Sequence, residues 1–328
     1  MTGSAMGIEW SASSVLEAGN FWETSRYGPE KALDGNPATA WVEGAPKGGI
    51  GESYVIALEH CPSALGFING YAENRSLFEK NYRIKELTVK IYAGVMVSGF
   101  ATEYVSFYDA VPITVDRTLR LSDTPDAQKV TLPFYRSYVQ TAMEKFRGSE
   151  EISTWDFPQA KEMGLSGTEG LPRSFKYILR LEIKAIYPGT TWEDTCLAEI
   201  WPDYGEVTDV SVTDDSRALL ISTPDGEEIR SYEDFEYVFS LVEHSENGEW
   251  AILIKEPAYA EPGRVSTEYA IVHTPTGRDV TDRLFEDPAV LGMEKLPTHF
   301  IEKEGKTFLV YDDFESGLTR QVVCPDIY

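Results

Sequence analysis

Oxygen-bearing side chains gather in one loop near the N-terminus, within residues 26–57. Asp34, Asn36 and Thr39 lie within six positions, and Asp34-Gly35 is a tight-turn pair. Such a loop can surround calcium with side-chain and carbonyl oxygens, because this hard cation takes six to eight oxygen ligands. The alternative is a turn in which Asp34 and Asn36 accept backbone N–H bonds, and the spacing alone favours that turn.

Aromatic, amide and basic residues on nearby loops form a second candidate site. Sugars stack their C–H faces on aromatic rings, while amide and charged side chains bind the hydroxyls. The residues of these types that we select as ligand-binding candidates are Trp22, Tyr27, Tyr71, Asn74, Arg75 and Arg83. We exclude Trp41 and expect it in the core, because a Trp directly before a strand is more often buried.

Some of these polar residues have a structural alternative. Asn69, Asn81 and Arg83 could form a network inside the domain, with Arg83 paired with Glu73 or Glu79. In that case these residues would be structural and would not bind a ligand.

Signals for enzyme chemistry are weak. The four histidines form no H-E-x-x-H or H-x-H motif, and the chain has no G-x-S-x-G elbow and no phosphate-binding loop. The glycine-rich residues 44–51 precede a strand rather than a helix, which is the wrong context for a dinucleotide. Paired carboxylates such as Glu193-Asp194 and Asp312-Asp313 could serve a glycosidase, but chance supplies such pairs among 54 acidic residues.

Composition restricts the class of protein. The chain has 328 residues, which suggests two domains, and 12% of them are aromatic, which favours a β-rich fold. The net charge of −25 makes nucleic acid an unlikely partner, because phosphate backbones would be repelled. No apolar run is long enough to span a membrane. Residues 1–6, MTGSAM, resemble a cloning remnant, so the lack of a visible signal peptide says little about export.

The cysteines do not define a site. Cys61, Cys196 and Cys324 form no C-x-x-C pair, which argues against zinc. Their odd number leaves at least one thiol free within a chain, and neither the pairing nor the redox compartment follows from the sequence.

Alternating apolar residues predict a series of strands. In the first two-thirds of the chain, strands are expected at residues 53–58, 64–71, 84–93, 176–186 and 195–201, with weaker candidates at 8–20, 95–110 and 129–133. Residues 134–173 interrupt this pattern and predict a partly helical insertion. Beyond a boundary at residues 202–205, short strands separated by turn pairs predict a second all-β domain, with short helices possible at 231–237 and 279–285.

Four segments resemble one known superfamily. They are KALDGNPATAWVEG, GGIGESYVIAL, GFINGYAENRSLFEKNYRIKELTVKIYAG and WEDTCLAEI. In this order they resemble discoidin-type domains, the coagulation-factor type C group with a galactose-binding-like jelly roll, and in particular the bacterial NADase-type glycan-binding branch. The resemblance covers roughly the first two hundred residues. It implies a structural calcium ion held by Ala32, Asp34, Asn36, Thr39 and Glu199, the last of these from the closing strand.

The sequence therefore predicts an all-β protein: a discoidin-like jelly-roll β-sandwich over residues 7–204, with an insertion at about 134–173, and a smaller β-rich domain over 205–328. We expect a non-catalytic protein that binds a glycan or another surface ligand, stiffened by calcium. We expect it to be bacterial, and secreted, periplasmic or surface-attached. One alternative is a hydrolase with its active site in the C-terminal domain or at the domain junction. A second is a structural or adhesive protein without a small ligand.

Overall fold

The computed structural model describes residues 2–3, 8–17, 25–97, 106–153, 171–234, 236–258, 268–285, 287, 290–292, 294–325 and 327. The chain forms two compact units, Met1–Pro202 and Asp203–Ile327. The candidate residue Trp22 lies outside the described residues.

The first unit is built on one hydrogen-bonded network of strands in the order β1-β2-β4-β10-β6-β11-β5-β9, with β3 paired to β11 and both β7 and β8 paired to β6. The strands are β1 Thr2–Gly3, β2 Glu9–Ala12, β3 Trp41–Val42, β4 Ser53–Leu58, β5 Ala64–Asn69, β6 Tyr82–Val97, β7 Asp109–Pro112, β8 Arg117–Arg120, β9 Ala127–Thr131, β10 Arg173–Tyr187 and β11 Thr195–Asp203. Strands far apart in this order, such as β4 and β5, bury side chains in the same core, as the two layers of a sandwich do.

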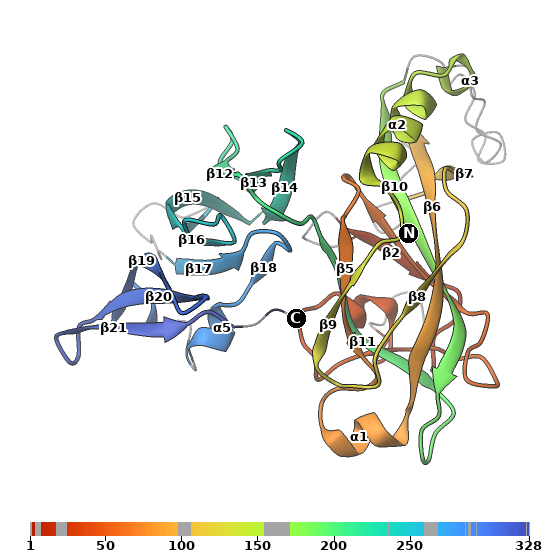
Figure 1. Cartoon of the computed structure of the whole chain (residues 1–328), viewed down its shortest axis with the longest axis horizontal. Helices are drawn as coiled ribbons and strands as arrows, with labels where there is room; N and C mark the ends of the chain where they lie inside the picture. The colour runs from red at the N-terminus through yellow and green to blue at the C-terminus, as the bar shows by residue number, and fades with distance from the viewer. Residues whose placement is uncertain are drawn as a thin grey trace. The chain divides into compact units, whose positions relative to one another are not determined.

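Two long antiparallel strands, β6 and β10, form the centre of this unit (Figure 1). Their apolar residues alternate and meet in register, with Leu179 opposite Ile91 and Leu181 opposite Val89. All four side chains are buried. Burial of each of these side chains stabilises the fold by about 1.5–3 kcal/mol. A shift of one residue in register would turn all of them to solvent, so the alternation in the sequence determines which face of the sheet is the core.

Short helices lie at opposite ends of β6 (Figure 1). The helix α1, Arg75–Lys80, precedes β6, while α2, Arg136–Arg147, and α3, Glu150–Ser153, belong to the predicted insertion. Val139 and Met143 of α2 are one turn apart and buried, so this helix docks through an apolar stripe. A 3-10 turn, η1, covers Pro29–Ala32 in the oxygen-rich loop.

The described part of the second unit forms three antiparallel sheets. They are β12 Asp209–Val212, β13 Ala218–Ser222 and β14 Glu228–Glu233; β15 Tyr237–His244, β16 Trp250–Pro257, β17 Glu268–His273 and β18 Arg278–Asp279; and β19 Lys295–Lys303, β20 Lys306–Asp313 and β21 Leu318–Val323. The turn pair Asn247-Gly248 joins β15 to β16, with φ of 70° at the glycine. A helix, α5, spans Thr281–Leu284, inside the range 279–285 suggested by the sequence. The helix considered at 231–237 is wrong, because these residues belong to β14, β15 and their connection.

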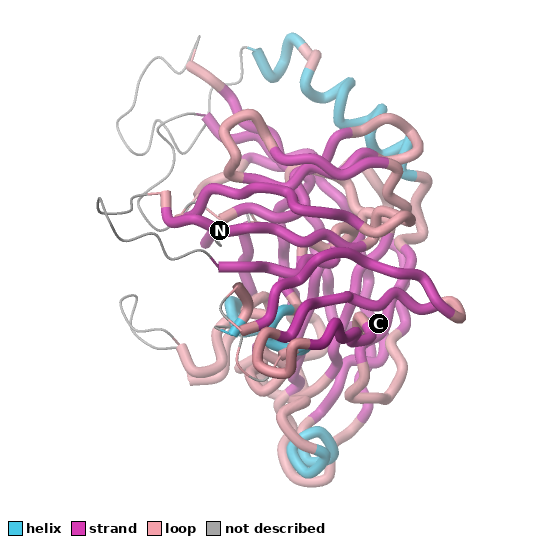
Figure 2. The backbone as a smooth tube through the Cα atoms, turned by 90° about the vertical axis from the view of Figure 1, so that its left-hand side faces the viewer, coloured by secondary structure: helices cyan, strands magenta, loops and turns pink. Residues whose placement is uncertain are grey.

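Strands dominate the described chain, and helices are short and few (Figure 2). The all-β prediction is therefore confirmed. Within the described residues, none of the helices has the length and apolar character needed to cross a bilayer.

Candidate ligand-binding site

A pocket of about 360 Å³ lies in the first unit, beside α1. It combines aromatic rings with charged and amide groups, which is the composition of many small-ligand sites. Its lining residues are Leu16, Arg26, Tyr27, Val42, Tyr71, Glu73, Leu77, Asn81, Trp192 and Asp194. The pocket thus unites Tyr27 and Tyr71, two of the candidates taken from the sequence.

The loop that carries Trp192 is fixed by backbone hydrogen bonds to the end of α1. Thr190 N donates to Glu79 O at 3.0 Å, and Trp192 N donates to Lys80 O at 3.0 Å. Gly189 permits this close approach, since a Cβ there would lie 2.3 Å from Lys80 O. Lys80 Nζ lies 5.6 Å from the centre of the Trp192 ring, which is 42% exposed. The ring is therefore held in place while part of it stays open to solvent.

The tyrosines and charges of the pocket influence one another. Burial raises the pKa of Tyr71, and the neighbouring Tyr27 and Glu73 raise it further, while Arg26 lowers it. The Arg26 guanidinium lies 5.2 Å from the centre of the Tyr27 ring. Burial also raises the pKa of Asp194, with a smaller contribution from Glu193. The charged groups are thus near the rings and partly removed from water.

Asn74 and Arg75 do not line this pocket. The Asn74 side chain caps α1 by accepting a hydrogen bond from Leu77 N at 2.9 Å. Arg75 is 80% exposed and pairs with Glu79 one turn later at 2.8 Å. Such an exposed pair contributes little to stability. In the structure, Asn74 therefore caps α1, and Arg75 forms an ion pair on its surface.

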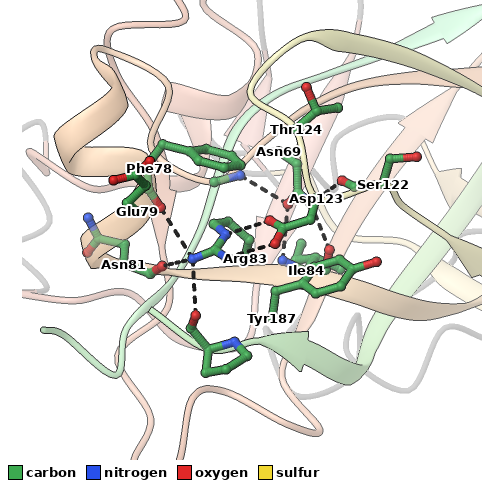
Figure 3. Close-up of polar contacts among 12 residues, drawn as sticks. Asn69, Phe78, Glu79, Asn81, Arg83, Ile84, Ser122, Asp123, Thr124 and Tyr187 are labelled. Atoms are coloured by element: carbon green, nitrogen blue, oxygen red, sulfur yellow. Dashed lines mark hydrogen bonds and ion pairs between the residues drawn. The ribbon is translucent and has the colours of Figure 1, made fainter. Parts of the chain in front are cut away.

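Arg83 is buried in a structural network, which corrects its assignment as a ligand-binding residue (Figure 3). Its Nε and Nη2 donate to the two carboxylate oxygens of Asp123 at 2.8 and 3.0 Å. Its Nη1 donates to the carbonyl oxygens of Phe78, Asn81 and Pro188. The network considered from the sequence thus exists, but its carboxylate is that of Asp123 rather than Glu73 or Glu79.

Asn69 completes the structural set in Figure 3. It is fully buried, accepts hydrogen bonds from Gly70 N and Ile84 N, and donates to Ile84 O at 2.7 Å. Trp41 is 1% exposed and donates through Nε1 to Ser14 O at 3.0 Å, so its expected place in the core is confirmed.

The oxygen-rich loop folds around the Thr39 hydroxyl. Thr39 Oγ1 lies 2.9 and 3.0 Å from the two carboxylate oxygens of Asp34, 2.9 Å from Asn36 O and 3.4 Å from Lys31 O. Asp34 and Asn36 also accept backbone N–H bonds, from Asn36 N and Ala38 N, as the turn interpretation expects. The Lys31 ammonium lies 3.7 Å from Asp34 Oδ2. The loop therefore contains both the hydrogen bonds of a turn and a cluster of oxygen atoms around the Thr39 hydroxyl.

Glu199 and residues of this loop both influence the ionisation of Tyr54. Glu199 is 2% exposed within β11. The Tyr54 hydroxyl donates to Pro29 O at 2.6 Å, and burial raises the pKa of Tyr54, with further contributions from Glu199, Glu30 and Asp34. Ala32 is fully buried at the end of η1. Across the described residues, no group of three or more His, Cys, Asp or Glu side chains is arranged for a metal.

The sequence did not identify several lining residues. Trp192 and Arg26 were not singled out, Glu73 was considered only as a partner of Arg83, and Glu193-Asp194 was treated as a chance carboxylate pair. The available signal was a tryptophan in the polar segment GTTWED, directly before the closing strand. A tryptophan among polar residues is often partly exposed. Its contact with Lys80 of α1, more than a hundred residues earlier, is created only by the fold.

Comparison with known proteins identifies the first unit. The model of the NAD glycohydrolase translocation F5/8 type C domain family matches residues 4–203. No curated protein matches the chain.

Solved structures show only distant likeness. An F5/8 type C domain from Bacteroides fragilis is 16% identical over 58% of this chain and 88% of that one, with a TM-score of 0.27. A Clostridium perfringens carbohydrate-binding module in complex with GlcNAc-α-1,4-galactose is 12% identical over 60% and 89%, with a TM-score of 0.24. Arabinofuranosyltransferase AftD from Mycobacteria is 11% identical, and the match spans 61% of this chain but only 11% of that protein, with a TM-score of 0.30. At these scores the structures add nothing to the family match.

Proposed function

Because this chain belongs to the NAD glycohydrolase translocation F5/8 type C domain family, we propose that it is a non-catalytic protein that binds glycans through the pocket beside α1. The observation that carries this proposal is the composition of the pocket. Three aromatic side chains, Tyr27, Tyr71 and Trp192, line one cavity together with amide and charged groups. F5/8 type C domains often bind carbohydrate, and rings beside polar groups suit the two kinds of surface that a sugar presents.

The loop and helix that line the pocket are also held in place before a ligand binds. The Trp192 loop is hydrogen-bonded to α1, and α1 is capped by Asn74 and anchored next to the buried Arg83 network. Side chains held by such contacts lose little conformational entropy when a ligand binds. A glycan ligand would place the protein outside the cytoplasm, either secreted or on the cell surface.

We also propose that a structural calcium ion stiffens the Asp34 loop. One hydroxyl, that of Thr39, lies within 3.4 Å of four oxygens from three residues, and a single proton cannot satisfy them all. These oxygen donors fit a hard cation. Asp34, Thr39 and the carbonyls near Ala32 and Asn36 would hold the ion, with the Glu199 carboxylate from β11. Calcium would supply charge neutralisation that links the loop to the closing strand.

The test of the glycan proposal is a glycan array, followed by isothermal titration calorimetry of the best glycan with the full chain in calcium. Trp192→Ala should weaken binding about tenfold or more, because loss of a central aromatic contact typically costs more than 1 kcal/mol. The matched control is Tyr138→Ala, which removes an aromatic ring that is 64% exposed on α2. Equal affinity of the Trp192→Ala variant and the unmodified protein would reject this pocket as the site.

A further inference from the structure

We propose that the pocket beside α1 selects sugars that carry a free amine, such as 2-amino-2-deoxyhexoses, over neutral and carboxylated sugars. This inference rests on the proposed glycan-binding function. The amine is cationic near neutral pH, so the proposal concerns the charge that the pocket prefers in its ligand.

The charged residues of the lining carry an excess of negative charge. Glu73 and Asp194 are acidic, while Arg26 is the single cation among the lining residues that the structure describes. Arg26 works against the proposed preference, but its guanidinium already lies over the Tyr27 ring. A carboxylated sugar would meet both acids at short range in a partly buried site, where repulsion is stronger than in water.

The two carboxylates also have unused hydrogen-bonding capacity. Within the described residues, neither Glu73 nor Asp194 makes a side-chain hydrogen bond or an ion pair. Glu73 is exposed, whereas Asp194 is half-buried. A bound ammonium could therefore donate to either acid without displacing a protein partner.

Asp194 is the better placed of the two acids. Its backbone carbonyl accepts a hydrogen bond from Tyr82 N at 3.1 Å, which ties this residue to the start of β6. Burial and the neighbouring Glu193 both disfavour its charged form and raise its pKa. A cation beside Asp194 would relieve both effects, because an opposite charge stabilises the carboxylate.

The aromatic lining acts in the same direction. Tyr27, Tyr71 and Trp192 line the space. Arg26 and Lys80 already lie 5.2 and 5.6 Å from the centres of the Tyr27 and Trp192 rings. Ring faces attract cations, and the attraction grows when the cation is partly desolvated. The two acids and the Tyr71 ring thus favour an amine, while the three rings still accept the C–H face of the sugar.

The experiment compares four forms of a hexose by isothermal titration calorimetry with the full chain in calcium, each as its gluco and its galacto epimer. The forms are the free hexosamine, its N-acetyl form, the parent hexose and the uronic acid. The hexosamine should bind about tenfold more tightly than the hexose, and the uronic acid should bind most weakly. Asp194→Asn should reduce hexosamine affinity to that of the hexose. Asp214→Asn, which removes an exposed acid of the second unit, is the charge-matched control and should keep the difference.

The outcomes separate this inference from the function on which it rests. Equal affinities for the four forms, each lost with Trp192→Ala, would overturn amine selection and leave glycan binding at this pocket intact. Retention of the amine preference in Asp194→Asn would overturn the role of Asp194. Failure of every sugar on the array and in calorimetry would reject both proposals.

Discussion

At the scale of single residues, Glu43 shows how a buried charge can hold two loops together. It is fully buried, and its oxygens accept hydrogen bonds from Ala45 N at 2.6 Å and from Thr195 N at 3.1 Å. Burial raises its pKa, and the two N–H bonds counter this effect. Gly49 makes room for it, since a Cβ there would lie 2.5 Å from the Glu43 carboxyl carbon. Glu43 thus joins the glycine-rich loop to the start of β11, next to Asp194.

We predict that Glu43→Ala lowers the free energy of unfolding by about 2–3 kcal/mol, because two backbone N–H groups lose their acceptor in a buried site. Urea denaturation followed by tryptophan fluorescence measures the change. Glu228→Ala, at an exposed position of β14, is the control and should change stability by less than about 0.5 kcal/mol. A Glu43 variant as stable as the control would contradict this structural role.

Single-residue roles were predictable only where neighbours in sequence decide them. Trp41 was assigned to the core because it directly precedes a strand-like segment, and it is buried. Arg83 was paired with nearby acids, yet its partner Asp123 is 40 residues away, which sequence spacing could not reveal. Trp192 was missed for the same reason, since its contacts with α1 depend on tertiary structure.

At the scale of elements, strands that alternate buried and exposed residues were predictable and several short polar strands were not. The strand β4 begins and ends at the predicted residues, and β6 and β10 extend beyond their predicted ranges. No strand was predicted at β8, β14 or β21, whose segments RTLR, EIRSYE and LTRQVV are rich in polar residues. Such strands are set by pairing with neighbours rather than by their own apolar pattern.

Substitutions at Asn74, the N-cap of α1, give a test at this scale, because they distinguish a capping role from a ligand-binding role. We predict that Asn74→Ala destabilises the protein by about 1 kcal/mol through loss of the N-cap. Asn74→Ser keeps a capping oxygen and should restore stability, as thermal unfolding would show. Glycan affinity should be similar for Asn74→Ser and the unmodified protein. Loss of affinity in the folded Asn74→Ser variant would instead mean that the amide contacts the ligand.

At the scale of the whole molecule, the proposed calcium ion would partly neutralise a chain with a net charge of −25 and would bind in its oxygen-rich loop. We predict that calcium at one hundred times its dissociation constant stabilises the folded protein by about 2.7 kcal/mol relative to EDTA, because an ion that binds only the folded state must stabilise it. This corresponds to a rise of about 5–10 °C in melting temperature for a unit of this size.

Two substitutions make the calcium experiment specific. Asp34→Asn should abolish the calcium-dependent rise. Asp126→Asn is the matched control, since Asp126 also accepts a hydrogen bond from a threonine, Thr124, but lies in another loop. A melting temperature that is the same in EDTA and calcium would reject the calcium proposal. The loop would then be held by its own hydrogen bonds.

The most direct test of the central claim is a crystal structure of the full chain with the tightest-binding glycan from the array, grown in calcium. The account predicts a sugar ring in the pocket beside α1, in contact with Trp192 and Tyr71 and with a polar group near Asp194. A glycan bound in the second unit, or elsewhere on the first with the pocket empty, would contradict it.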